Sequence, residues 1–214
     1  MSSADLQVFG GVVVASDIEE AVVTTLKKWY PTYLSMLARK MEIDWDLLPA
    51  PRNYTNRNNF EGESGEEIPK VVVIAPGLMS PPSQYGQGQY RAIWRLGVGV
   101  ATAGKDEKIA NKLTKAYGAA TRMILVQKQA LESPPGINIA EVTWTEESYA
   151  DMPIPNKIQL YKSASLFFGV DVENVVNKWK GPETPITTEP LPYPTVETVD
   201  IELDLEVSGK GVSS

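Results

Sequence analysis

The chain of 214 residues contains no cysteine and no histidine, and its 27 acidic and 20 basic residues give a formal charge of −7. The absence of these two residue types excludes disulfide frameworks, thiolate zinc sites and histidine-dependent catalytic triads, so an enzyme would depend on carboxylates or lysine. The acidic balance also argues against a surface that coats nucleic acid.

No targeting or membrane segment is indicated. The first eleven residues contain Asp5 and no lysine or arginine, so the basic start of a secretory signal is missing. Apolar runs such as Gly10–Ala15 and Val71–Ala75 are much shorter than the ~20 residues that a membrane helix needs. We therefore expect a soluble product that is assembled inside the cell and has no membrane partner.

The first predicted helix begins at a capping box formed by Ser16 and Glu19. Apolar residues then recur at helical spacing, which is typical of one buried helix face. Pro31 removes one hydrogen bond of the helix, so a kink or break is expected there, with the helix resuming over Tyr33–Met41.

The next part of the chain alternates between loops and strands. Asp44–Glu67 is polar and without periodicity, which predicts a loop, and Lys70–Ala75 is a β-branched run that predicts a strand. Leu78–Gln89 is rich in proline and glycine and is interpreted as a mobile loop. Tyr90–Thr102 alternates apolar residues with others, which predicts a long half-buried strand antiparallel to its predecessor.

A second helix is predicted over Asp106–Ala130, because apolar residues trace one face after an acidic first turn. Strands over Ile137–Tyr149 and Lys157–Val172 follow, and Lys162 interrupts the apolar face of the second. The order α-β-β-α-β-β predicts an α+β fold, in which an antiparallel or mixed sheet is flanked by two main helices, with an additional strand near the C-terminus.

The chain divides into a body (residues 1–180), a proline-rich linker (181–194) and an acidic strand arm with a flexible end (195–214). Most of the negative charge belongs to the last two parts. Because an isolated strand cannot satisfy its backbone polar groups, the arm must add to a sheet, in its own subunit or in a neighbour. We predict that deleting Pro194–Ser214 weakens oligomerisation and leaves the monomer folded. The apolar residues that would form the oligomer interface are Val199, Ile201, Leu203, Leu205 and Val207, which alternate with Asp200, Glu202, Asp204 and Glu206.

The sequence contains few motifs that indicate catalysis or the binding of a cofactor or metal ion. Neither a GxGxxG fingerprint nor a P-loop occurs, and Gly86-Gln87-Gly88 is interpreted as a loop tip. The acidic clusters Glu61–Glu67 and Glu146-Glu147 are interpreted as solvated loops, with a cation site as the alternative. We therefore assign no catalytic, cofactor-binding or metal-binding residue. One face of the second helix carries Lys108, Lys112 and Lys115, which fits a solvated face or a contact to phosphate or an acidic partner.

The element order and two segments, IPKVVVIAPG and YRAIWRLGVGVATAGKDEKIANKL, resemble the tail terminator proteins of long-tailed bacteriophages (siphophages), especially those of actinobacterial phages. These proteins are also called tail completion or head–tail joining proteins. The resemblance covers about Ala15 to Val172 and includes no catalytic motif. It implies a structural virion protein rather than an enzyme.

The resemblance further implies a homo-oligomeric ring, a hexamer, in the neck at the top of the tail, assembled in the host cytoplasm. Such a ring terminates tail-tube polymerisation and joins the tail to the head, so its partners are other copies of itself, the tail-tube protein and the head–tail connector or stopper protein. DNA passes through the lumen without specific contact. The acids at positions 200, 202, 204 and 206 would then face the lumen or solvent.

Two alternatives remain open at this point. One is another neck or tail component, such as a head-completion stopper or a tube subunit. The other is a carboxylate- or lysine-dependent enzyme, which would need convergent side chains in a pocket.

Overall fold

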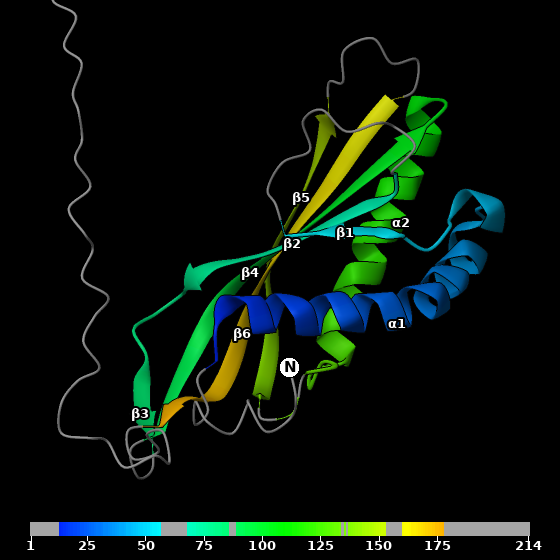
Figure 1. Ribbon diagram of the computed structural model, residues 1–214. Helices are drawn as coiled ribbons and strands as arrows, with labels where there is room; N and C mark the ends of the chain where they lie inside the picture. The colour runs from blue at the N-terminus through cyan, green and yellow to red at the C-terminus, as the bar shows by residue number, and fades with distance from the viewer. Residues whose placement is uncertain are drawn as a thin grey trace, which may run out of the picture. The chain divides into compact units, whose positions relative to one another are not determined.

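The computed structural model describes residues 13–56, 68–85, 89–133, 135, 137–152 and 160–177. These residues form an α+β fold, as predicted (Figure 1). The helices are α1 (Ala15–Met41), the one-turn 3₁₀ helix η1 (Trp45–Leu47) and α2 (Glu107–Gln127). The strands are β1 (Asn53–Thr55), β2 (Lys70–Leu78), β3 (Ser83–Tyr85), β4 (Gln89–Gly104), β5 (Asn138–Met152) and β6 (Leu160–Asn177).

The predicted order α-β-β-α-β-β corresponds to α1, β2, β4, α2, β5 and β6. The two short strands β1 and β3 lie in stretches that were expected to be loops. The sheet order is β1-β2-β4-β6-β5, and β3 pairs with β4 at the side of this path. Only β1 and β2 pair in parallel among the described strands, so the sheet is mixed, and the predicted antiparallel pairing of β2 with β4 is confirmed.

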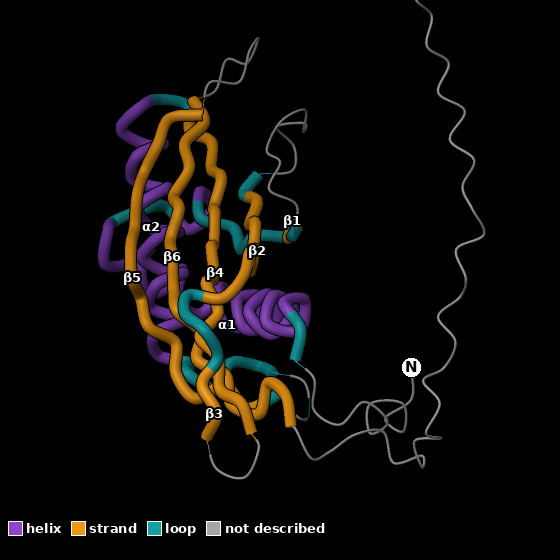
Figure 2. The backbone as a smooth tube through the Cα atoms, turned by 90° about the vertical axis from the view of Figure 1, so that its left-hand side faces the viewer, coloured by secondary structure: helices purple, strands orange, loops and turns teal. Residues whose placement is uncertain are grey.

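The core lies between the sheet and the two helices. On β4 the alternate residues Ala92, Leu96, Val98 and Val100 are at most 3% exposed, because they point to the face on which both helices lie (Figure 2). Their partners on β6, among them Phe168, are equally buried. The predicted apolar alternation of this strand is therefore confirmed, and no described helix covers the opposite face of the sheet.

Helix α1 differs from its prediction at two positions. Its N-cap is Val14, whose backbone N–H donates to the Asp17 carboxylate at 2.8 Å, so the box predicted from Ser16 and Glu19 is wrong. Glu19 instead accepts a hydrogen bond from the Ala75 backbone N–H at 2.8 Å, beside a bulge in β2.

The predicted break at Pro31 is also wrong, because α1 continues through this residue to Met41. Pro31 itself is exposed, whereas Tyr30 and Leu34 on either side are fully buried. Packing of these two side chains thus maintains the helix across the missing hydrogen bond.

Helix α2 begins after Asp106, whose carboxylate accepts from the Ile109 backbone N–H at 2.8 Å. It lies close to the end of β4, since a Cβ on Gly104 would come within 2.5 Å of the Ala110 nitrogen. The helix ends at Gln127, three residues before the predicted end. Strands β5 and β6 extend beyond their predicted C-terminal ends, to Met152 and Asn177.

Candidate assembly surfaces

The residues predicted to form the oligomer interface and the lumen, positions 199–207, lie outside the described residues, as do the linker and the chain end. The glycine-containing tip at residues 86–88 and the whole first acidic cluster, Glu61–Glu67, lie outside them as well. The predictions made for these segments are therefore not tested by the structure.

The second acidic cluster is described, and it lies on β5 rather than in a loop. Glu147 forms an ion pair with Arg122 and accepts a hydrogen bond from the Tyr149 hydroxyl. Glu146 pairs with Phe167 and Glu147 with Leu166, so the two carboxylates point to opposite faces of the sheet. Within the described ranges, no group of three or more acidic side chains is placed to hold a metal ion.

The three lysines predicted to share one face of α2 do not form one continuous basic surface. Lys112 donates to the Glu42 carbonyl at 3.0 Å and so ties α2 to the end of α1, whereas Lys108 is exposed. Lys115 lines a small cavity of about 150 Å³ between α2 and the strands β5 and β6. In the same cavity Lys162 forms an ion pair with Asp151, which explains how a lysine is accommodated on the helix-covered face of β6.

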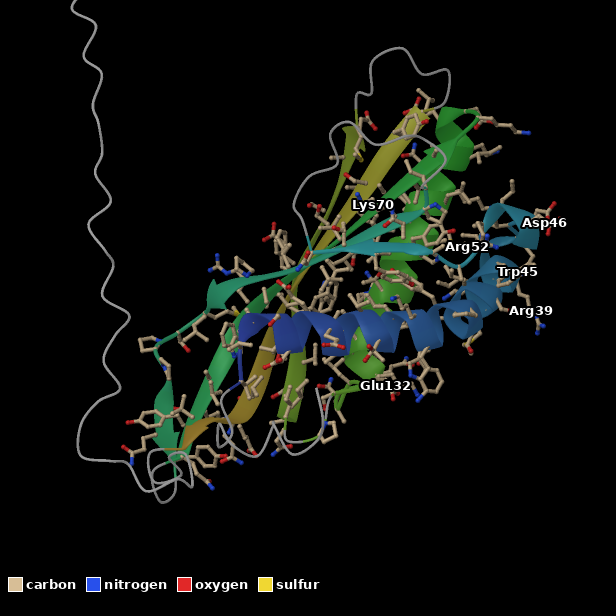
Figure 3. The ribbon with its side chains drawn as sticks, in the orientation of Figure 1. Arg39, Trp45, Asp46, Arg52, Lys70 and Glu132 are labelled. Atoms are coloured by element: carbon tan, nitrogen blue, oxygen red, sulfur yellow. The ribbon has the colours of Figure 1, made fainter. Side chains whose placement is uncertain are left out.

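Two exposed aromatic surfaces stand out, and neither was expected from the sequence. The first, here called the α1 surface, consists of the end of α1 and the turn after it. Three large apolar side chains are exposed there, Met36 (54%), Trp45 (46%) and Leu47 (45%), beside the exposed Arg39 and Lys40. Figure 3 shows Arg39 and Trp45 gathered with Asp46 and Arg52 at this end of the molecule.

The turn that presents Trp45 is fixed by local hydrogen bonds. Glu42 adopts a left-handed conformation (φ 50°) that ends α1, and the Ile43 N–H returns to the Ala38 carbonyl at 3.0 Å. The Asp44 carboxylate then accepts from the Asp46 backbone N–H at 3.2 Å and caps η1.

Two core contacts anchor the far side of the same turn. Leu48 is fully buried, and the Tyr117 hydroxyl donates to the Pro49 carbonyl at 2.6 Å. Burial raises the pKa of Tyr117, so this hydroxyl keeps its proton at neutral pH. Trp45 and Leu47 therefore face solvent from a well-anchored turn, which is typical of a contact surface.

The second surface, here called the β5 surface, consists of Trp144 and Tyr149, which lie on the helix-covered face of β5, whereas Glu141 and Glu146 point to the opposite face of the sheet. Trp144 and Tyr149 are each 45% exposed. The strand is at an edge of the sheet, since no described strand pairs with its outer side. Long unpaired edges are potential sites for pairing with another chain.

Side chains cover part of this edge. Gln129 accepts from the Val142 backbone N–H and donates to the Val142 carbonyl at 3.2 Å, so one side-chain amide satisfies both backbone groups of that residue. The Trp144 indole N–H donates to the Glu146 carbonyl at 3.1 Å, and the Arg122 guanidinium lies 4.9 Å from the Trp144 ring centroid. Trp144 is thus held in one orientation while almost half of it stays exposed.

Comparisons with known proteins add little to this geometry. No protein-family model matches the chain, and no curated protein matches it. Among solved structures, a chain described as part of the "Virion of native gene transfer agent (GTA) particle" is similar, with 15% sequence identity and a TM-score of 0.39. The match covers 65% of this chain and 85% of that chain. At this TM-score the likeness carries no argument about function. No helix in the described ranges is long and apolar enough to cross a membrane.

Proposed function

We propose that this chain is a structural virion protein that forms a homohexameric ring at the head-proximal end of a siphophage tail. There it terminates polymerisation of the tail tube and joins the tail to the head–tail connector, while DNA passes through its lumen. In this proposal the protein acts by assembly and not by catalysis.

The observation that carries the proposal is the pair of exposed aromatic surfaces, one at the end of α1 and one on the edge strand β5. A ring of identical subunits is built from heterologous contacts, in which one surface of each copy binds a different surface of the next. A subunit therefore needs two such surfaces, and both must stay exposed in the isolated chain.

The element order supports the more specific role. The resemblance to tail terminator proteins implies a body with the order α-β-β-α-β-β, and this chain has that order over α1, β2, β4, α2, β5 and β6. The acidic strand predicted at residues 199–207 is, in this proposal, an additional contact between subunits, with its carboxylates facing the lumen or solvent.

Native mass spectrometry and negative-stain images of the purified chain test the ring, with a six-fold particle and a central hole as the expected result. A strict monomer at all concentrations would contradict the proposal. Addition of the chain to polymerising tail-tube protein tests the terminator role, because a terminator shortens the tubes and caps one end. A head-completion stopper would bind the connector without changing the length of the tubes.

A further inference from the structure

We infer that the acidic arm of one copy adds as a further strand to the outer edge of β5 in an adjoining copy, over residues 147–151. This contact requires a second copy and therefore rests on the proposed function, which it deepens by naming the docking site of the arm. Three features carry it: the direction of backbone groups on β5, the exposed aromatic side chains beside them and the alternation of residues 199–207.

The outer edge of β5 offers backbone groups for another strand. Gln129 binds both backbone groups of Val142, which therefore point away from β6. Residues of β5 that lie opposite the same row of β6 point their backbone groups to the same side. Val142 lies opposite Val170, and three later residues of β5 lie opposite the same row. These are Glu147, Tyr149 and Asp151, opposite Leu166, Ala164 and Lys162.

The outward backbone groups of residues 147, 149 and 151 are here called the open edge. In the described part of the chain, no hydrogen bond is made to them and no strand lies beyond them. Exposed backbone groups of this kind are a template on which a strand from another chain adds. The opposite edge of the sheet is occupied, because β1 pairs with the first residues of β2 and Glu19 of α1 accepts from Ala75 at the β2 bulge.

The side chains beside the open edge favour an apolar strand. Trp144 and Tyr149 lie on the helix-covered face of β5, and each is 45% exposed at the edge of the sheet. A strand added there places its own side chains directly beside those of β5, with Cβ atoms about 4.5–5.5 Å apart. An apolar row on this face would therefore bury aromatic surface that a single copy leaves in water.

The arm supplies such a row. Its apolar residues occupy the odd positions from Val199 to Val207, and acids occupy the even positions between them. With the odd positions on the helix-covered face, the acids lie on the opposite face, beside the uncharged Ser148. The reverse orientation would place them beside the carboxylates of Glu147 and Asp151, each already in an ion pair, and like charges on facing strands are destabilising.

The linker is long enough to reach an adjoining copy. Strand β6 ends at Asn177, and the residues of β6 opposite the open edge lie about 35–50 Å before this end along the strand. Residues 178–198 span up to ~70 Å when extended, and the five prolines of residues 181–194 make the linker semi-rigid. A stiff linker that leaves the sheet at this end favours the open edge of another copy over that of its own.

Disulfide cross-linking tests the contact, because the chain contains no cysteine and every bond must come from the introduced pair. Ser148→Cys is combined in turn with Asp200→Cys, Glu202→Cys, Asp204→Cys and Glu206→Cys. Under mild oxidation at least one of these pairs should form a bond between two chains, because both residues lie on the same face of adjacent strands. Ser148→Cys combined with Ile201→Cys or Leu203→Cys is the control and should react at least tenfold more slowly.

The position along β5 has its own control. Thr143→Cys changes an exposed residue on the same face as Ser148, but it lies beside Val142, where Gln129 closes the edge. It should therefore react at least tenfold more slowly with the same four arm variants. An equimolar mixture of the single variant Ser148→Cys with the best single arm variant should give bonds between the two unlike chains, which only a contact between copies can form.

Hydrogen exchange gives a second measurement that needs no cross-link. In the assembled full-length chain the amides of the open edge should be protected, and Leu203→Pro should speed their exchange at least tenfold because proline disrupts a paired strand. The Val142 amide, which Gln129 binds within the subunit, should not change. Thr188→Pro, which adds a proline to the linker, is the matched control and should leave the exchange of all these amides unchanged.

The possible outcomes separate the two proposals. A wild type that stays monomeric at all concentrations contradicts both the proposed function and this contact. Wild-type rings in which both rows of the arm react equally with Ser148→Cys, or in which neither row reacts, overturn the contact alone. A bond that forms only within one chain also overturns it, and assigns the arm to the edge of its own copy.

Discussion

At the scale of single residues, the buried hydrogen bond between Tyr30 and Thr121 links the two helices. The oxygens of the two hydroxyls are 2.6 Å apart, and Thr121 also donates to the Tyr117 carbonyl at 2.8 Å, so the proton in the first bond comes from Tyr30. Thr121→Val leaves the Tyr30 hydroxyl buried without a partner, which should cost about 1–3 kcal/mol. Tyr30→Phe removes the donor and leaves Thr121 satisfied, so the expected cost is smaller, about 0.5–1.5 kcal/mol.

Urea denaturation of both variants measures the difference. Thr24→Val is the matched control, because Thr24 is exposed on α1 and the same β-branched exchange there should change the free energy of unfolding only slightly. Equal costs for the two buried variants would show that the hydroxyl of Tyr30 finds another partner.

Because Tyr30 is buried, the free energy of unfolding is also expected to fall in alkaline solution. Burial raises the pKa of Tyr30, so its hydroxyl stays protonated in the folded chain while it ionises near pH ~10 in the unfolded chain. Above that pH the unfolded state binds fewer protons, and the free energy of unfolding should fall by up to about 1.4 kcal/mol per pH unit from this group. Unfolding measured from pH ~9 to ~11 should show a smaller fall for Tyr30→Phe than for the wild type. If the free energy of unfolding fell equally with pH in Tyr30→Phe and in the wild type, the effect could not be assigned to Tyr30.

At the scale of secondary structure, α1 is stable in spite of Pro31. Proline in a helix interior is about 3 kcal/mol less favourable than alanine. Proline also lowers the conformational entropy of the unfolded chain, which stabilises the folded state by about 0.4–1 kcal/mol. Pro31→Ala should therefore stabilise the protein by about 2–2.6 kcal/mol, because the Lys27 carbonyl regains its hydrogen bond. Thr32→Ala, at the exposed position beside it, is the control and should give a smaller gain. A decrease in melting temperature for Pro31→Ala would show that α1 requires the proline.

At the scale of the whole molecule, the described core runs from Val13 to Val175 and includes both helices and the long strands. Because this core is extensive without the C-terminal arm, deletion of Pro194–Ser214 should leave the circular dichroism and the melting temperature unchanged. The dissociation constant of the oligomer should rise at least tenfold. Light scattering that finds the same oligomer after truncation would exclude the arm as a contact between subunits.

The regular elements could be predicted because their periodicity is local. The alternation of Tyr90–Thr102 and the helical spacing of both helices identified every long element within a few residues. The three-residue strands β1 and β3 could not be predicted, since each exists only through pairing with a strand elsewhere in the chain. Continuity of α1 through Pro31 likewise depends on tertiary packing of Tyr30 and Leu34, which no local pattern records.

The candidate surfaces were missed for a related reason. Trp45 lies in a polar stretch, and its exposure follows from the anchoring of Leu48 and Pro49 by the core. A tryptophan between two aspartates was the available signal. The exposure of Trp144 follows from the position of its strand at the edge of the sheet, and strand order cannot be read from the elements alone.

The side chain of Gln129 has a consequence for how copies can meet. Its amide offers Val142 one donor and one acceptor, as the peptide group of an adjacent strand would. It is therefore a one-residue imitation of a neighbouring strand, and it closes β5 to backbone pairing at that point. A second copy therefore cannot extend the sheet by pairing with the backbone of Val142, and any contact that it makes there must use side chains.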